Sequence, residues 1–159
     1  NRIYRYSQEA DSLELYLSFN GLNFPNGITS DDQNQFLFIS TSEGIVRVDI
    51  SGKHYALLEA AQQINAKQID GLSYYKNSLI GHQSVKISRF YLTTDRSRIE
   101  RVELLDSGPE FDSTTTGELD NNFYVYIVNS QIQSGVDYGK RAAKPFDSLE
   151  NIIIRRIQL

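Results

Sequence analysis

The sequence predicts an all-β protein made of β-propeller blades. Short strand-like runs separated by turn residues occur along nearly the whole chain, and a glycine-led set of strands repeats three times. With 159 residues, of which 40% are hydrophobic and 23% charged, the chain has the size and composition of one ordinary globular domain. Both the periodicity and the repeat point to the same fold class.

The strand-like runs are rich in β-branched and aromatic residues, and most are separated by Gly, Asn, Asp and Ser. Only residues 55–68 could form a helical turn or two, which is too short to change the class. The expected strands cover residues 2–7, 13–19, 35–41, 44–50, 54–60, 71–75, 78–83, 86–93, 98–105, 122–129 and 151–159.

The repeat becomes visible when Gly27, Gly71 and Gly117 are aligned, at spacings of 44 and 46 residues. Each glycine is followed by a short strand, a polar turn and further strands, and repeats of this length with four strands are typical of propeller blades. The sequence therefore predicts about three blades. These blades cover 27–60, 71–105 and 117–159, and residues 2–19 supply a further, partial blade.

Three blades alone would leave two apolar blade faces and open strand edges in water. The chain also has no Met, and it begins inside a strand-like run. We therefore expect a partial propeller in which residue 1 is not the native start. A missing N-terminal half, or a second copy of the chain, would close the ring.

Composition and charge exclude several classes of protein. The net charge of −4 argues against a nucleic-acid partner, which requires a basic face. No apolar run reaches the roughly 18 to 20 residues of a membrane helix, and no signal peptide is visible. The absence of cysteine excludes disulfides and thiolate ligands, but it leaves the compartment open between cytoplasmic and exported.

The repeat predicts a site at one mouth of the propeller. Strand one of a blade leaves this mouth and strand two returns to it, so residues before the first strand and after the second should meet there. Asn26, Asp70 and Thr116 directly precede the aligned glycines. The residues expected from the second strands are Ser40, Thr41, His82, Gln83, Asn129, Ser130 and Gln131.

Carboxylate, amide and hydroxyl oxygens are hard ligands that suit Ca²⁺, Mg²⁺ or Mn²⁺. Asn26 and Asp70 are the expected metal ligands, while Thr116, His82, Asn129 and Gln131 are expected to line a substrate site. The structural alternative is that Asn and Asp before Gly only shape turns. His82 could shuttle protons, or it could simply hydrogen-bond a loop.

A family resemblance sharpens these expectations. "PNGITSDDQNQFLFIST" followed one blade later by "IDGLSYYKNSLIGHQ" resembles the gluconolactonase and regucalcin (senescence marker protein) family of six-bladed propellers. "STTTGELDNNFYVYIVNSQ" is similar to a C-terminal blade of bacterial relatives. The resemblance covers nearly the whole chain, as the C-terminal half of such a propeller.

The resemblance implies a metal-dependent hydrolase acting on a sugar lactone, a small-molecule substrate. Asn26 and Asp70 would be two ligands of a divalent cation on the propeller axis, and Asp70 would also be the general base. The family's other ligands, a Glu and a second Asn, belong to N-terminal blades that this chain lacks. Since propellers host many functions, a non-catalytic ligand- or protein-binding module is the alternative.

One long loop carries positive charge. Residues 138–146 contain Lys140, Arg141 and Lys144 and follow the last predicted strand that returns to the mouth. The loop could be a lid that recruits an anionic substrate, or it could be a solvated loop.

Overall fold

A computed structural model describes residues 1–159, and it consists of strands with one short 3-10 helix, η1 (Phe146–Ser148). The all-β prediction is confirmed. Residues 55–68, where a helical turn was possible, contain strands and loop but no helix. No helix is long and apolar enough to cross a membrane.

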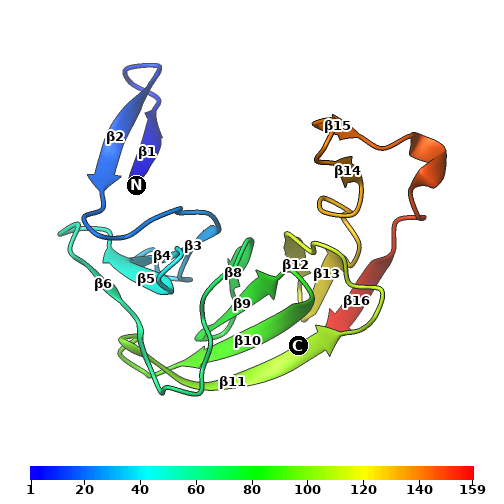
Figure 1. Cartoon of the computed structure of the whole chain (residues 1–159). Coiled ribbons are helices and arrows are strands. Elements are labelled where there is room, and N and C mark those ends of the chain that lie inside the picture. The colour runs from blue at the N-terminus through cyan, green and yellow to red at the C-terminus, as the bar shows by residue number, and fades with distance from the viewer.

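Three mainly antiparallel sheets form the body of the molecule, and Figure 1 shows them side by side in an arc. The first sheet contains β3 (Ile28–Ser30), β4 (Phe36–Ser40), β5 (Ile45–Asp49) and β6 (Tyr55–Leu57). The second contains β8 (Leu72–Tyr74), β9 (Ser78–Gln83), β10 (Lys86–Leu92) and β11 (Arg98–Ser107). The third contains β12 (Gly117–Asp120), β13 (Phe123–Ile127) and β16 (Ile154–Gln158).

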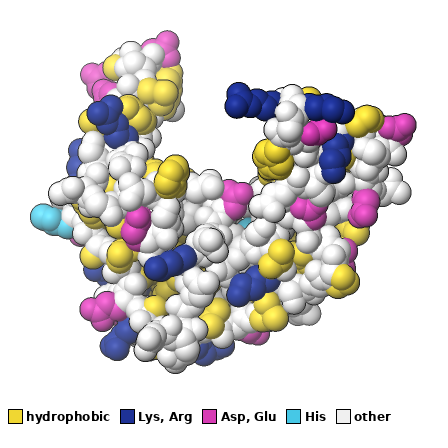
Figure 2. Space-filling model, viewed as in Figure 1, with side chains coloured by type: hydrophobic (Ala, Val, Ile, Leu, Met, Phe, Trp, Pro, Cys, Tyr) yellow, Lys and Arg dark blue, Asp and Glu magenta, His cyan; other side chains and the backbone are white.

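Two hairpins project from the ends of the arc, on the same side of it (Figure 1). Their strands are β1 (Arg2–Ser7) and β2 (Ser12–Ser18) at one end, and β14 (Val136–Asp137) and β15 (Ala142–Ala143) at the other. In the space-filling view of Figure 2, a wide hollow separates the two projections.

The strand expected at 54–60 divides into β6 and β7 (Glu59–Ala60), which belong to different sheets. Between them Leu58 is buried in the core shared by the first and second sheets. Beyond it, β7 pairs in parallel with the outer strand β11 of the second sheet. The single apolar run therefore ties two neighbouring sheets together.

The sheets pack face to face, and the residues of the middle strands alternate between two cores. Leu79 faces the core between the first and second sheets, while Ile80 faces the core between the second and third. Because both faces of the second sheet are covered, every residue of β9 is buried. The first strands β3 and β12 both contact β8, so the three sheets converge at their inner edges. This convergence positions the candidate site.

Candidate functional site

Glycine brings the inner ends of the sheets into backbone contact. A β-carbon on Gly27 would lie 2.6 Å from the amide nitrogen of Leu72, and one on Gly71 would lie 2.9 Å from the Cα of Thr116. Real β-carbons are essentially never closer than 3.0 Å. Gly27 and Gly71 thus allow the first and second sheets each to touch the turn of the next sheet, and the residues before these turns are drawn together.

The first two repeats share one hydrogen-bond pattern at this point. Asn26 N–H donates to Ser40 O at 3.0 Å, and Ser40 N–H donates to Gly27 O at 2.9 Å. Asp70 N–H donates to His82 O at 2.8 Å, and His82 N–H donates to Gly71 O at 3.0 Å. Because main-chain groups fix these segments, the side chains of Asn26 and Asp70 are not used to shape their own turns.

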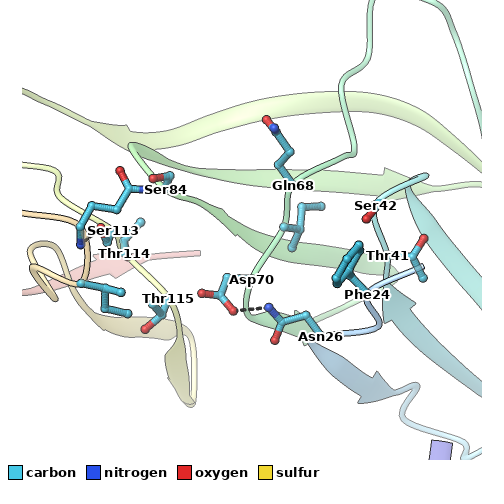
Figure 3. Close-up of a pocket in the computed structure, with 13 residues that line it drawn as sticks. Phe24, Asn26, Thr41, Ser42, Gln68, Asp70, Ser84, Ser113, Thr114 and Thr115 are labelled. Atoms are coloured by element: carbon cyan, nitrogen blue, oxygen red, sulfur yellow. Dashed lines mark hydrogen bonds between the residues drawn. The ribbon is translucent and has the colours of Figure 1, made fainter. Parts of the chain in front are cut away.

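Those two side chains meet instead in a cavity. Asn26 Nδ2 donates to Asp70 Oδ1 at 2.6 Å, across a sequence separation of 44 residues (Figure 3). The cavity has a volume of about 460 Å³ and lies at the converging inner ends of the sheets. Its lining residues are Phe24, Asn26, Thr41, Ser42, Gln68, Ile69, Asp70, Ser84, Ser113, Thr114, Thr115, Ile132 and Gln133.

The lining is polar but nearly uncharged. Hydroxyl groups come from Thr and Ser residues in the loops beside all three sheets, and amides come from Asn26, Gln68 and Gln133. Asp70 is the single ionisable side chain, and no Lys, Arg or His lines the cavity. Neutral donors and acceptors of this kind match a ligand that carries many hydroxyl groups and no net charge.

Asn26 and Asp70 carry the oxygen atoms that a hard divalent cation prefers, but two residues are too few to complete its coordination. Each supplies an oxygen, whereas such a cation takes about six. Nowhere in the chain do three His, Asp, Glu or Cys residues gather closely enough to hold a metal ion. Asp70 Oδ2 has no hydrogen-bond partner, so one carboxylate oxygen is open to the cavity.

Thr116 does not line the cavity. It is exposed, and the preceding Thr115 takes the place expected for it. A β-carbon on Gly27 would meet the carbonyl of Asp70, the residue before Gly71, whereas one on Gly71 would meet the carbonyl of Thr115, two residues before Gly117. The third repeat thus presents its threonine pair one residue out of register.

His82 is fully buried behind the cavity wall and does not reach the cavity. Its Nδ1 lies 2.8 Å from Thr114 Oγ1, and its Nε2 lies 2.8 Å from Tyr124 Oη. Burial lowers the pKa of His82 to about 4, so the imidazole is neutral near pH 7. The main chain of His82 thus lies beside Asp70 as expected, but its side chain points away from the cavity and forms hydrogen bonds in the interior.

The hydrogen bonds around His82 fix its tautomer. The Thr114 hydroxyl donates its only proton to Ile127 O at 2.8 Å, so it must accept from His82 Nδ1–H. Nε2 is then the acceptor for the Tyr124 hydroxyl. Burial raises the pKa of Tyr124 to about 12, which keeps that proton in place. Through Thr114, this chain of bonds holds the cavity wall against the second sheet.

Asn129 and Gln131 also lie outside the cavity and are buried. Asn129 Oδ1 accepts from Ile153 N–H at 2.7 Å, and Gln131 Oε1 accepts from Glu150 N–H at 2.8 Å. Both bind the segment that leads into β16. Since Gly117 pairs with Tyr126, both residues come after the point at which the second strand returns to the mouth.

Of the other second-strand residues, Thr41 lines the cavity, whereas Ser40 and Gln83 bond to backbone carbonyls. Lys140, Arg141 and Lys144 are exposed and none of them lines the cavity. Figure 2 shows Lys and Arg side chains gathered at the tip of the β14–β15 projection. The loop does not cover the site in this structure.

Sequence reasoning missed several lining residues. Phe24 is two positions before Asn26 in the same predicted turn, and this proximity could have indicated that it also lines the cavity. Ser84 lies in the tight turn between β9 and β10, and its carbonyl accepts from Thr114 N–H at 3.0 Å. That contact joins turns of two different sheets, and no pattern in the sequence around either residue predicts it.

Comparison with known proteins supports the fold. No protein-family model and no curated protein matches the chain. Among solved structures 26 chains match. The pyranose dehydrogenase PQQ domain from Coprinopsis cinerea has a TM-score of 0.56 at 17% identity, over 78% of this chain and 32% of that chain.

Two structures of the carbohydrate-active enzyme family AA12 from Trichoderma reesei are also similar, each at 13% identity. The calcium structure has a TM-score of 0.51 over 67% of this chain and 29% of that one. The iodide structure has a TM-score of 0.52 over 79% of this chain and 32% of that one. This chain thus spans about a third of the length of these neighbours. The neighbours are β-propeller-type domains, so the predicted fold class is confirmed.

Proposed function

We propose that this chain forms part of a sugar-acting propeller enzyme, and specifically a divalent-cation-dependent hydrolase of sugar lactones. The observation that carries the proposal is the contact of Asn26 with Asp70 at 2.6 Å in a cavity lined by neutral polar groups. The neighbours named above as sugar-oxidising or carbohydrate-active enzymes support a sugar ligand. The resemblance to gluconolactonases supports the hydrolytic reaction.

The two residues would divide the work as follows. Asn26 and Asp70 would hold the cation with the Asn26 amide oxygen and an Asp70 carboxylate oxygen, so the amide would rotate away from its present hydrogen bond. Bound there, the cation would polarise the lactone carbonyl and make a coordinated water more acidic. Asp70 would accept the proton of the attacking water, since its Oδ2 faces the cavity with no partner.

The remaining ligands must come from water and from further blades. We propose that further propeller blades, from the same polypeptide or from a second copy, complete both the ring and the site. The exposed apolar side chains of the β1–β2 hairpin, among them Leu13 at 71% exposure, support an additional packing partner. Light scattering tests this, because a stable 18.1 kDa monomer at micromolar concentration would contradict it. We also propose that the blades of this chain have the boundaries inferred from the repeat, with a partial blade at 2–19 and blades at 27–60, 71–105 and 117–159.

A second candidate, sugar oxidation with a quinone cofactor, follows from the pyranose dehydrogenase PQQ domain among the neighbours. Pyrroloquinoline quinone carries three carboxylates, and anions of this kind are held by Lys and Arg. The cavity offers neither and has one carboxylate of its own. The residues present therefore do not fit that cofactor, and the neutral lactone is the better match.

Calorimetric titration with Ca²⁺, Mg²⁺ and Mn²⁺ tests the cation site. We expect wild-type protein to bind one of these ions, and Asn26→Ala and Asp70→Ala to weaken binding at least about tenfold each. Asp32→Ala is the matched control, because Asp32 is an exposed turn carboxylate outside the cavity. No binding by wild type, or binding retained in both variants, would contradict the proposed site.

The reaction is tested by following acid release from a sugar lactone at constant pH. We expect cation-dependent turnover by wild type, and loss of turnover in Asp70→Asn. A parallel assay supplies pyrroloquinoline quinone, an aldose and an electron-accepting dye. Dye reduction without lactone hydrolysis would favour the second candidate, and binding of sugar with neither activity would favour a non-catalytic module.

A further inference from the structure

One aromatic residue at the cavity has no structural partner. Phe24 is 81% exposed, yet it lines the cavity next to Asn26. It is the only aromatic side chain among the lining residues. Figure 3 shows it on the Asn26 side of the cavity, with Ser113 and Thr114 on the opposite side of Asp70.

The backbone around Phe24 is fixed although its ring is free. Asn23 O accepts from Ser42 N–H at 2.9 Å, and Asn23 N–H donates to Glu43 Oε2 at 2.8 Å. On the other side of Phe24, Asn26 N–H is bonded to Ser40 O. The ring is therefore carried by a segment that is anchored on both sides.

Phe24 also has an unfavourable backbone conformation. Its φ of +50° lies in the left-handed region, which is a rare place for a bulky residue. Glycine or asparagine would fit this turn with less strain. Within this chain, a strained, exposed aromatic in an anchored turn gains nothing from packing, so the contact that offsets its strain lies outside this chain.

We propose that Phe24 is a stacking platform for the apolar face of a sugar ring bound in this cavity. One face of a pyranose ring carries a patch of C–H groups that packs on aromatic rings, while its hydroxyl groups require hydrogen-bonding partners. The cavity combines the two requirements, since Phe24 supplies the aromatic surface and the Thr, Ser, Asn and Gln side chains supply the partners. The inference deepens the proposed function and rests on it for the class of ligand.

NMR titration in the presence of Ca²⁺ tests the proposal by measuring the binding of 1,5-anhydroglucitol, a six-membered sugar ring with no carbonyl. We expect Phe24→Ala and Phe24→Leu to weaken binding about fivefold, and Phe24→Trp to bind within about twofold of wild type. Phe146→Ala is the matched control. Phe146 is 91% exposed and lies in η1, outside the cavity, so its removal should leave binding unchanged.

A packing role is separated from a binding role by stability. We expect Phe24→Gly to unfold at the same temperature as wild type or higher, because glycine relieves the left-handed strain, while it loses sugar binding as Phe24→Ala does. Full binding by Phe24→Ala, no binding by wild type, or a marked loss of stability in Phe24→Gly would each overturn the proposal.

The result is distinguishable from failure of the cation site. If sugar binding depends on Phe24 while Asn26→Ala and Asp70→Ala leave cation binding unchanged, the platform stands and the hydrolase proposal fails. If the cation binds through Asn26 and Asp70 but Phe24→Leu binds sugar like wild type, only the platform is overturned.

Discussion

No β-carbon fits at Gly27 against the backbone carbonyl of Asp70. The nearest competing atoms are main-chain atoms of the neighbouring sheet, which cannot rotate away as a side chain could. We therefore expect Gly27→Ala to lower the free energy of unfolding by about 2 kcal/mol or more. Chemical denaturation measures this.

Gly139→Ala is the control, because a β-carbon there meets only the Asp137 carboxylate at 3.3 Å. Equal stability of the two variants would contradict close backbone packing at Gly27. We also expect Gly27→Ala to weaken cation binding, since moving the sheets apart separates Asn26 from Asp70.

A second prediction concerns the ion pair that joins the first two sheets. Arg96, in the β10–β11 turn, binds the fully buried carboxylate of Asp31 and also contacts the exposed Asp32 at 3.3 Å. Removing one partner of a buried pair leaves an uncompensated charge, so Arg96→Met should cost about 3 kcal/mol of stability. Asp32→Asn should cost at most about 1 kcal/mol because that pair is solvent-exposed. Thermal and urea unfolding of the two variants would be compared, and a similar cost for both would show that burial of Asp31 is not decisive.

The third prediction is a pH dependence of stability due to His82. Its pKa in the folded protein is about 4, below the ordinary value of 6.5, so between these values the unfolded chain binds more protons. Stability should therefore fall by up to about 3 kcal/mol as the pH drops from about 6.5 to 4, and this contribution should level off below pH 4.

Urea unfolding at a series of pH values measures this slope, and a His82→Gln variant should lack it whatever its own stability. His54→Gln is the control, because His54 is exposed. An unchanged slope in His82→Gln would assign the pH dependence to other groups.

The fourth prediction is the His82 tautomer. The bonds to Thr114 and Tyr124 require a proton on Nδ1 and a lone pair on Nε2. Nitrogen-15 chemical shifts of the labelled ring should show this directly at pH 7. Tyr124→Phe removes the only partner of Nε2 and should cost about 1 to 3 kcal/mol. A proton found on Nε2 would reverse the direction of the whole chain of bonds.

The sequence predicted the parts of this molecule that repeat. Alternation and turn residues located nearly all the strands, and the aligned glycines located Asn26 and Asp70 at one end of two sheets. This worked because a repeated unit puts equivalent residues in equivalent places. The same logic failed for Thr116, Asn129 and Gln131, because the third sheet departs from the register of the first two.

Other features depend on contacts that no local pattern encodes. Residues 54–60 divide between two sheets because Leu58 is buried in the core between them. The His82 side chain is buried where its ring bonds to the hydroxyl of Thr114, from the segment that leads into the third sheet. The lining contributed by Ser84 and Thr115 arises where turns of different sheets touch. Such features become visible only when the sheets are packed.

The contact between each glycine and the following turn has a consequence for how such a protein can change. The glycine sets the distance between neighbouring sheets. Main-chain hydrogen bonds hold the residue before it, so the side chain of that residue is not needed to form the turn. In the first two repeats that position holds Asn26 and Asp70, and both side chains reach the cavity. Evolution, or an engineer, can therefore exchange the chemistry delivered to the centre one residue at a time without disturbing the scaffold.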